Sequence, residues 1–160
     1  MTLLAIDAGN TRVKWAIHDG KAWAAHGFAP TETVRDQGLQ FGLKHGAQPV
    51  ARIVACNVAG NAVAGALTRA AAYLNAPLSI IVSQPAQCGV TNAYRHPAQL
   101  GTDRWAALIG ARALVNAPRA TLVILAGTAL TVDALYAQGQ HLGGIIVPGA
   151  PLMRAALASG

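Results

Sequence analysis

The chain has 160 residues, and 53% of them are hydrophobic while 11% are charged, so it can bury a substantial core and is not a disordered protein. The formal net charge is +6, but the nine arginines and three lysines are scattered without a basic run or interleaved aromatic residues. We therefore expect no specific nucleic-acid partner, and a pocket for an anionic substrate explains the charge at least as well.

Cysteine usage and hydropathy exclude several further classes of protein. Cys56 and Cys88 are far apart and belong to no C-x-x-C pair, so neither a zinc site nor a disulfide framework is indicated. No apolar run reaches the ~18 residues that a membrane-spanning helix needs, and the N-terminus lacks the pattern of a secretory signal. We expect a cytoplasmic protein with no membrane partner.

The first half of the chain predicts a three-stranded antiparallel meander and then a β-α-β passage with parallel strands. Apolar alternation and turn residues mark the strands, and two longer segments have helical character. The expected elements are strands at 2–7, 13–17 and 22–28, a helix at 32–45, a strand at 50–55, a helix at 61–75 and a strand at 78–82.

The second half predicts a loop, a helix and then a second meander that repeats the first. The loop covers 83–99 and the helix 106–114. Strands are expected at 121–125, through 131–135 and at 141–147, with a last helix at 150–158. Residues 7–10 can be placed over residues 125–128, because each set ends one strand and opens a glycine turn into the next.

The turn after the first strand, Asp7-Ala8-Gly9-Asn10-Thr11-Arg12-Val13-Lys14, allows two interpretations. Gly9 has no side chain and tolerates positive φ, so a phosphate group could reach the backbone N–H groups of the turn. Asp7 could then hold a hydrated metal ion beside the phosphates. The alternative is an ordinary β-hairpin with an Asx-type turn.

Four segments, taken in order, resemble the type III pantothenate kinases, which belong to the superfamily of acetate and sugar kinases, actin and heat-shock chaperone ATPases. The segments are residues 7–14, residues 94–97 with 100–105, residues 127–133 and residues 143–149. The resemblance implies an α/β fold with duplicated actin-like ATPase (ribonuclease H-like) lobes, each a mixed sheet flanked by helices. It implies a first lobe over 1–100, and a linking helix and the start of an incomplete second lobe over 101–160.

The resemblance also implies an activity, the ATP-dependent phosphorylation of pantothenate to 4'-phosphopantothenate in coenzyme A biosynthesis. By resemblance Asp103 is the catalytic base, and Asp7 holds Mg²⁺ or another divalent cation. The implied ATP and phosphate ligands are Asp7, Ala8, Gly9, Asn10, Thr11, Arg12, Val13, Lys14, Gly127 and Thr128. The implied pantothenate ligands are Tyr94, Gly101, Thr102, Asp103 and Arg104.

Structural alternatives remain for the acidic and histidine side chains. Asp103 stands at a helix start, where an aspartate commonly caps the helix. Asp133 either binds a cation-held water or projects from a strand. The five histidines share no ligand spacing, and we assign them no chemistry.

One position departs from the family pattern in a way that bears on cofactors. An aspartate that helps hold a monovalent cation commonly precedes the second Gly-Thr by two residues, and here that residue is Leu125. An apolar side chain cannot replace an anionic oxygen ligand, so we expect little dependence on K⁺ or NH₄⁺. The family's active sites lie at a dimer interface, which implies a homodimer.

Two other functions stay open from the sequence. One is a non-catalytic protein of the same fold that binds a ligand or nucleic acid, and the other is a kinase for another small hydroxyl acceptor. Pantothenate-dependent ADP release separates the kinase from a nucleic-acid binder, whose DNA retention would fall steeply with salt.

Overall fold

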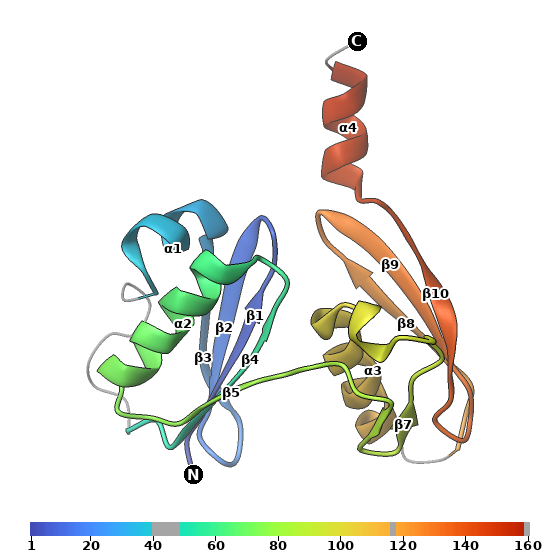
Figure 1. Cartoon of the computed structure of the whole chain (residues 1–160), viewed down its shortest axis with the longest axis horizontal. Helices are drawn as coiled ribbons and strands as arrows, with labels where there is room; N and C mark the ends of the chain where they lie inside the picture. The colour runs from blue at the N-terminus through green and yellow to red at the C-terminus, as the bar shows by residue number, and fades with distance from the viewer. Residues whose placement is uncertain (40–48, 116–117, 159–160) are drawn as a thin grey trace. The chain divides into compact units, whose positions relative to one another are not determined.

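The computed structural model describes residues 1–39, 49–115 and 118–158. They form two compact units, Met1–Ile81 and Val82–Gly160 (Figure 1). Residues 82–100 belong to the second unit by their contacts, and the lobe boundary expected after residue 100 stays a prediction. No helix within the described ranges is long and apolar enough to cross a membrane.

The first unit is a five-stranded mixed sheet with the order β3-β2-β1-β4-β5. The expected meander is β1 (Leu3–Ala8), β2 (Arg12–His18) and β3 (Trp23–Pro30), and its neighbouring strands are antiparallel. β4 (Arg52–Asn57) pairs in parallel with β1, and β5 (Leu78–Ile80) pairs in parallel with β4. The predicted change from antiparallel to parallel pairing is confirmed.

Alternation along the strands explains why one face of this sheet is covered. In β1 the side chains of Leu4 and Ile6 are buried, as expected for a strand with one core face. Two helices, α1 (Thr31–Gln37) and α2 (Asn61–Tyr73), cover that face (Figure 1). Burying one leucine or isoleucine side chain contributes about 1.5–3 kcal/mol, so this layer supplies much of the unit's stability.

The helix predicted over residues 32–45 is wrong in its length. α1 ends at Gln37 because Gly38 adopts φ of 80°, a left-handed conformation that glycine favours and that stops an α-helix. Residues 40–48 of the predicted helix lie outside the described residues.

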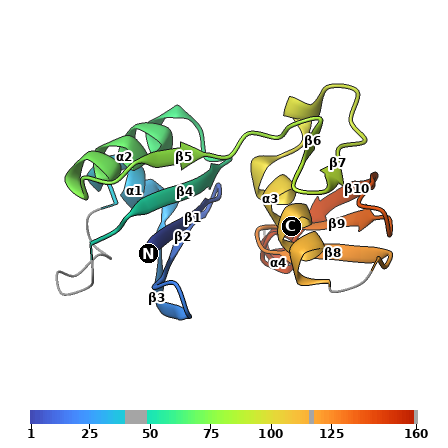
Figure 2. The same cartoon turned by 90° about the horizontal axis from the view of Figure 1, so that it is seen from below.

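The second unit contains the repeated meander. Its strands are β8 (Thr121–Ala126), β9 (Ala129–Leu135) and β10 (His141–Pro148), in the antiparallel order β10-β9-β8. Figure 2 shows α3 (Thr102–Leu114) against this sheet, where it contacts β8 and β9. A last helix, α4 (Ala150–Ala158), follows β10. The strand order confirms the repetition predicted from the sequence.

The segment before α3 has more structure than the loop predicted over 83–99. It contains two short strands, β6 (Ala86–Gln87) and β7 (Val90–Thr91), and one 3₁₀ turn, η1 (Pro97–Gln99). α3 also begins before residue 106, where we predicted its start. The prediction was late because the first turn is polar and the apolar periodicity starts only at Trp105. Residues 102–104 therefore form the first turn of α3.

Candidate functional site

The first hairpin presents an exposed turn between β1 and β2. The backbone N–H of Gly9 donates to the carbonyl oxygen of Arg12 over 3.0 Å, and the side chains of residues 10–12 are exposed. Ala8 and Val13, predicted phosphate residues, are fully buried in the core. They can therefore contribute only backbone groups to a ligand.

Thr31 anchors this turn from the first residue of α1. Its backbone N–H donates to the carbonyl oxygen of Thr11 over 3.0 Å, and its hydroxyl donates to the carbonyl oxygen of Gly9 over 2.7 Å. Thr31 is buried, so these bonds are shielded from water. We did not single out Thr31 from the sequence, because its partners in the turn lie far from it along the chain.

The Asp7 carboxylate lies beside the same turn and is available to a cation. Its Oδ2 lies 3.1 Å from Lys14 Nζ, and its Oδ1 accepts a weak hydrogen bond from the Cys56 thiol over 3.4 Å. The side chains of Asp7 and Lys14 are 42% and 61% exposed, so their ion pair contributes at most about 1 kcal/mol to stability and opens readily.

No group of three metal-binding side chains occurs among the described residues. Mg²⁺ commonly binds one or two carboxylates and completes its shell with water and phosphate oxygens, so an accessible Asp7 fits that ion.

The second hairpin also reverses at a glycine, but its turn is shorter than the first, because Ala126 pairs with Leu130 whereas Ala8 pairs with Val13. The N–H of Gly127 donates to the carbonyl oxygen of Ala129 over 3.0 Å, and both Gly127 and Thr128 are exposed. Gly149, which follows β10, donates its N–H to the carbonyl oxygen of Thr128 over 2.8 Å. A Cβ atom on Gly149 would collide with the carbonyl oxygens of Gly127 and Thr128, so a glycine is required at this close approach. In both units the residue after the third strand thus anchors the glycine turn.

Asp103 lies in the first turn of α3. Its Oδ1 accepts the backbone N–H of Arg104 over 2.8 Å, and the side chain is half-buried. Gly101 is close enough that a Cβ atom there would lie 2.6 Å from the same oxygen. Gly101 is the N-cap of α3, and among the described residues no side-chain hydrogen bond is made at this cap, so Asp103, the second residue of α3, is not its N-cap. Its carboxylate supports the first turn through the Arg104 N–H and can also accept a proton.

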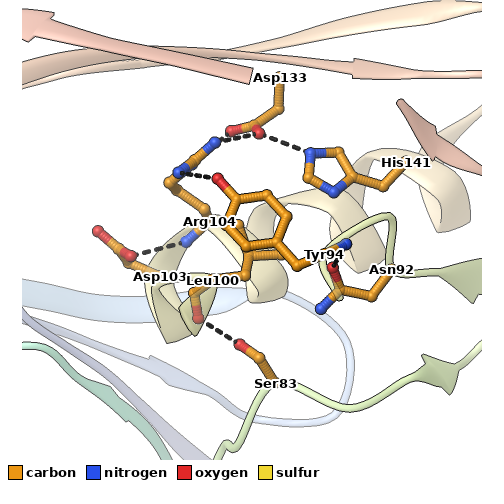
Figure 3. A network of polar contacts seen from close by, with 8 residues as sticks. All are labelled: Ser83, Asn92, Tyr94, Leu100, Asp103, Arg104, Asp133 and His141. Carbon is orange, nitrogen blue, oxygen red and sulfur yellow. Dashed lines mark hydrogen bonds and ion pairs between the residues drawn. The ribbon is translucent and has the colours of Figure 1, made fainter. Parts of the chain in front are cut away.

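Arg104 points away from solvent and is paired with Asp133 on β9 (Figure 3). Nε donates to Oδ2 over 2.8 Å and Nη2 donates to Oδ1 over 2.6 Å, a two-pronged pair in which both residues are at most 4% exposed. This carboxylate raises the pKa of Arg104 above its usual range, so the guanidinium stays charged. Arg104 Nη1 also donates to the Tyr94 hydroxyl over 3.3 Å.

His141 on β10 completes this buried network (Figure 3). Its Nε2 lies 2.8 Å from Asp133 Oδ1, and its ring stacks on the Tyr94 ring with centroids 5.8 Å apart. Gly144 lies opposite Asp133, and a Cβ atom there would collide with Asp133 Oδ1 and lie 2.6 Å from Arg104 Nη2. The structure therefore brings together two predicted substrate residues, Tyr94 and Arg104, with Asp133.

From the sequence we assigned His141 no role, and for Asp133 we left two roles open, binding a cation-held water or projecting from a strand. The only sequence signal was a polar residue on the inward face of a strand in each case, which does not reveal a partner on another element.

The comparisons with known proteins agree with this architecture. The family model described as type III pantothenate kinase matches residues 3–160. A type III pantothenate kinase of Aromatoleum aromaticum is 48% identical over 156 residues, which cover 98% of this chain and 62% of that protein. One of Nitrosospira multiformis is 46% identical over 155 residues, which cover 95% of this chain and 56% of that protein.

Two solved structures share the fold at low identity. The ethanolamine utilization protein EutJ of Carboxydothermus hydrogenoformans has a TM-score of 0.53 and 12% identity, covering 99% of this chain and 56% of that chain. A Sinorhizobium meliloti protein assigned as a 2-dehydro-3-deoxygalactonokinase has a TM-score of 0.59 and 18% identity, covering 96% of this chain and 56% of that chain. The predicted fold class, a mixed α/β actin-like ATPase fold, is confirmed.

The chain spans about three fifths of the length of the curated relatives it matches. Within that span the family match is continuous from the first strand to the last helix. The family predicted from the four sequence segments is confirmed, and the chain belongs to the type III pantothenate kinase family.

Proposed function

We propose that this protein transfers the γ-phosphoryl group of ATP to the primary hydroxyl of pantothenate, which forms 4'-phosphopantothenate and ADP in coenzyme A biosynthesis. The family match over residues 3–160 carries this proposal. Enzymatic phosphoryl transfer depends mainly on positioning and on neutralising charge. Two anchored glycine turns and a carboxylate on a helix start support it, because they offer backbone donors and a base.

In the proposed mechanism the protein's own residues divide the work. The turns at residues 9–12 and at Gly127 and Thr128 bind the phosphates of ATP. The N–H groups of Gly9 and Gly127 are already bonded within their turns, so these two glycines give the phosphates room to approach, and their neighbours supply the donors. Asp103 accepts the proton of the pantothenate hydroxyl as its oxygen attacks the γ-phosphorus and ADP leaves. Tyr94, Gly101, Thr102 and Arg104 orient pantothenate. Asp7 would hold Mg²⁺ or another divalent cation, which neutralises phosphate charge.

In this proposal Arg104 binds pantothenate through only part of its guanidinium. Since Asp133 already occupies Nε and one N–H of Nη2, and the Tyr94 hydroxyl occupies one N–H of Nη1, only the remaining N–H groups of the guanidinium are available to an anionic substrate oxygen. Arg104 would therefore orient pantothenate by hydrogen bonding more than by net charge, because Asp133 compensates its charge.

Replacing Asp7 by asparagine tests the nucleotide part of the proposal. Asp7→Asn keeps the shape and removes one charge, so Mg-ATP affinity measured by calorimetry should fall about tenfold or more while the melting temperature stays close to wild type. Asp36→Asn, at an exposed aspartate on α1, is the matched control and should bind like the wild type. Equal affinity in Asp7→Asn and wild type would remove Asp7 from the metal site.

We also propose weak dependence on monovalent cations. Leu125 is a half-buried apolar residue on β8 and offers no anionic oxygen to K⁺ or NH₄⁺. The rate of pantothenate-dependent ADP release should change less than about twofold when K⁺ replaces Na⁺ at constant ionic strength. A rise of tenfold or more would show that other groups hold the ion.

The assembly and location remain part of the proposal. The family resemblance suggests a homodimer in the cytoplasm that binds pantothenate and ATP and no specific nucleic acid. Release of ADP that requires pantothenate, without salt-sensitive retention of DNA, is the result we expect, and the reverse result would favour a nucleic-acid-binding protein.

A further inference from the structure

We propose that His141 is a positioning residue for the acceptor substrate, which acts by holding Tyr94 and Asp133 in one arrangement beneath the pantothenate pocket. This inference rests on the proposed function, in which Tyr94 and Arg104 contact pantothenate. His141 itself is 2% exposed and is not offered as a substrate ligand.

The geometry carries the inference because His141 joins two groups that come from different elements. Its ring plane is within 17° of the Tyr94 ring plane, and its Nε2 reaches the Asp133 oxygen that also accepts Arg104 Nη2. Tyr94 in turn accepts a hydrogen bond from Arg104. The contacts form a closed ring of four side chains from the segment before α3, α3, β9 and β10 (Figure 3). Moving one member therefore displaces the others.

The pocket residue that depends most on His141 is Tyr94. Tyr94 lies outside any helix or strand and is half-buried, and its backbone is fixed by an Asx turn in which its N–H donates to Asn92 Oδ1 over 3.0 Å. Its side chain stacks on His141, accepts the bond from Arg104 at its hydroxyl, and has Arg104 Cζ 6.0 Å from its ring centroid. Without the imidazole, the Tyr94 ring loses one face of packing and can rotate about its χ angles.

The tautomer of His141 follows from its burial. Nδ1 is buried and finds no hydrogen-bond partner among the described residues, whereas Nε2 faces a carboxylate. A buried N–H without a partner is costly, so the tautomer with its proton on Nε2 is favoured over the one with its proton on Nδ1, and Nε2 donates to Asp133. The bond fixes the direction of the ring that supports Tyr94.

Two substitutions separate the two contacts. His141→Phe keeps an aromatic ring against Tyr94 and removes the bond to Asp133, while His141→Gln keeps a donor and removes the ring. Because a hydrogen bond or an aromatic pair is worth about 1 kcal/mol, each should raise KM for pantothenate about fivefold. His141→Ala should raise it by about twentyfold or more, with KM for ATP within about twofold of wild type.

His26→Ala, at an exposed histidine on β3, is the control and should change neither constant. A purely structural role of His141 predicts a lower melting temperature with both KM values unchanged, or with both raised alike. Either result in folded His141→Ala protein would overturn the proposal.

A substrate-free measurement keeps this inference separable from the proposed function. In the wild type the stacked imidazole should shift the ring proton resonances of Tyr94, and His141→Ala should return them to unstacked positions while His141→Phe keeps a shift. If the wild type neither binds nor phosphorylates pantothenate, the proposed function fails and the acceptor-positioning role fails with it. If the wild type turns over and the Tyr94 resonances do not move in His141→Ala, the positioning role alone is overturned.

Discussion

Replacing Asp103 by asparagine is expected to lower kcat by about 10²–10⁴ while binding of ATP stays near normal. General-base assistance is typically worth that factor, and an amide cannot accept the hydroxyl proton. The side chain is nearly isosteric, and its Oδ1 can still accept the backbone N–H of Arg104 that it now accepts over 2.8 Å. Steady-state kinetics of ADP release at saturating pantothenate measures the effect.

The same substitution distinguishes the competing role for Asp103. The asparagine Oδ1 can accept the same N–H of the first turn, so a purely structural role at the start of α3 predicts near-wild-type kcat and a melting temperature close to wild type. Asp103→Ala removes both the base and the hydrogen bond from the Arg104 N–H, so it should lower kcat as much as Asp103→Asn does and also destabilise α3 by about 1 kcal/mol. Near-wild-type kcat in folded Asp103→Asn would remove this residue from the mechanism.

The strands and their repetition could be predicted from the sequence because they depend on local signals. In β1 and β9 every second side chain faces the core. A glycine in the first turn of each meander marks where the chain reverses. The site motifs were equally local, since each is a short run at the end of a strand or the start of a helix.

Helix ends were harder to predict because they depend on single backbone conformations. Gly38 ends α1 by its left-handed φ, yet glycine within a helical pattern does not always adopt it. The start of α3 was predicted too late, because its first turn carries the polar residues Thr102, Asp103 and Arg104 and shows no apolar periodicity.

The anchoring contacts could not be predicted because they join residues that are far apart in the sequence. Arg104 and Asp133 are separated by 29 residues, and Thr31 and Gly9 by 22. Pairing at that distance depends on strand register, which places Gly144 opposite Asp133 and leaves room for the guanidinium. Registers of β8, β9 and β10 were not available from composition or spacing.

Replacing Asp133 by leucine is expected to destabilise the second unit by about 3–5 kcal/mol. Its two hydrogen bonds from Arg104 and its bond from His141 Nε2 are lost, and a buried guanidinium remains with no anionic partner among the described residues. Arg104 cannot lose its proton to relieve this cost, because guanidinium stays charged in proteins. Hydrogen exchange of the β9 and α3 amides reports the loss for this unit alone.

The double variant Arg104→Met/Asp133→Leu is the matched control. It removes both charges together, and apolar replacement of a buried ion pair is often neutral or stabilising, so much of the lost stability should return. The part due to the lost acceptor of His141 Nε2 should not return, and pantothenate turnover should stay low. The difference between the single and double variants measures the coupling of the pair. If Asp133→Leu alone costs less than about 1 kcal/mol, the guanidinium is not confined by Asp133, and Arg104 would be a freely charged ligand for the substrate rather than one held in place by β9.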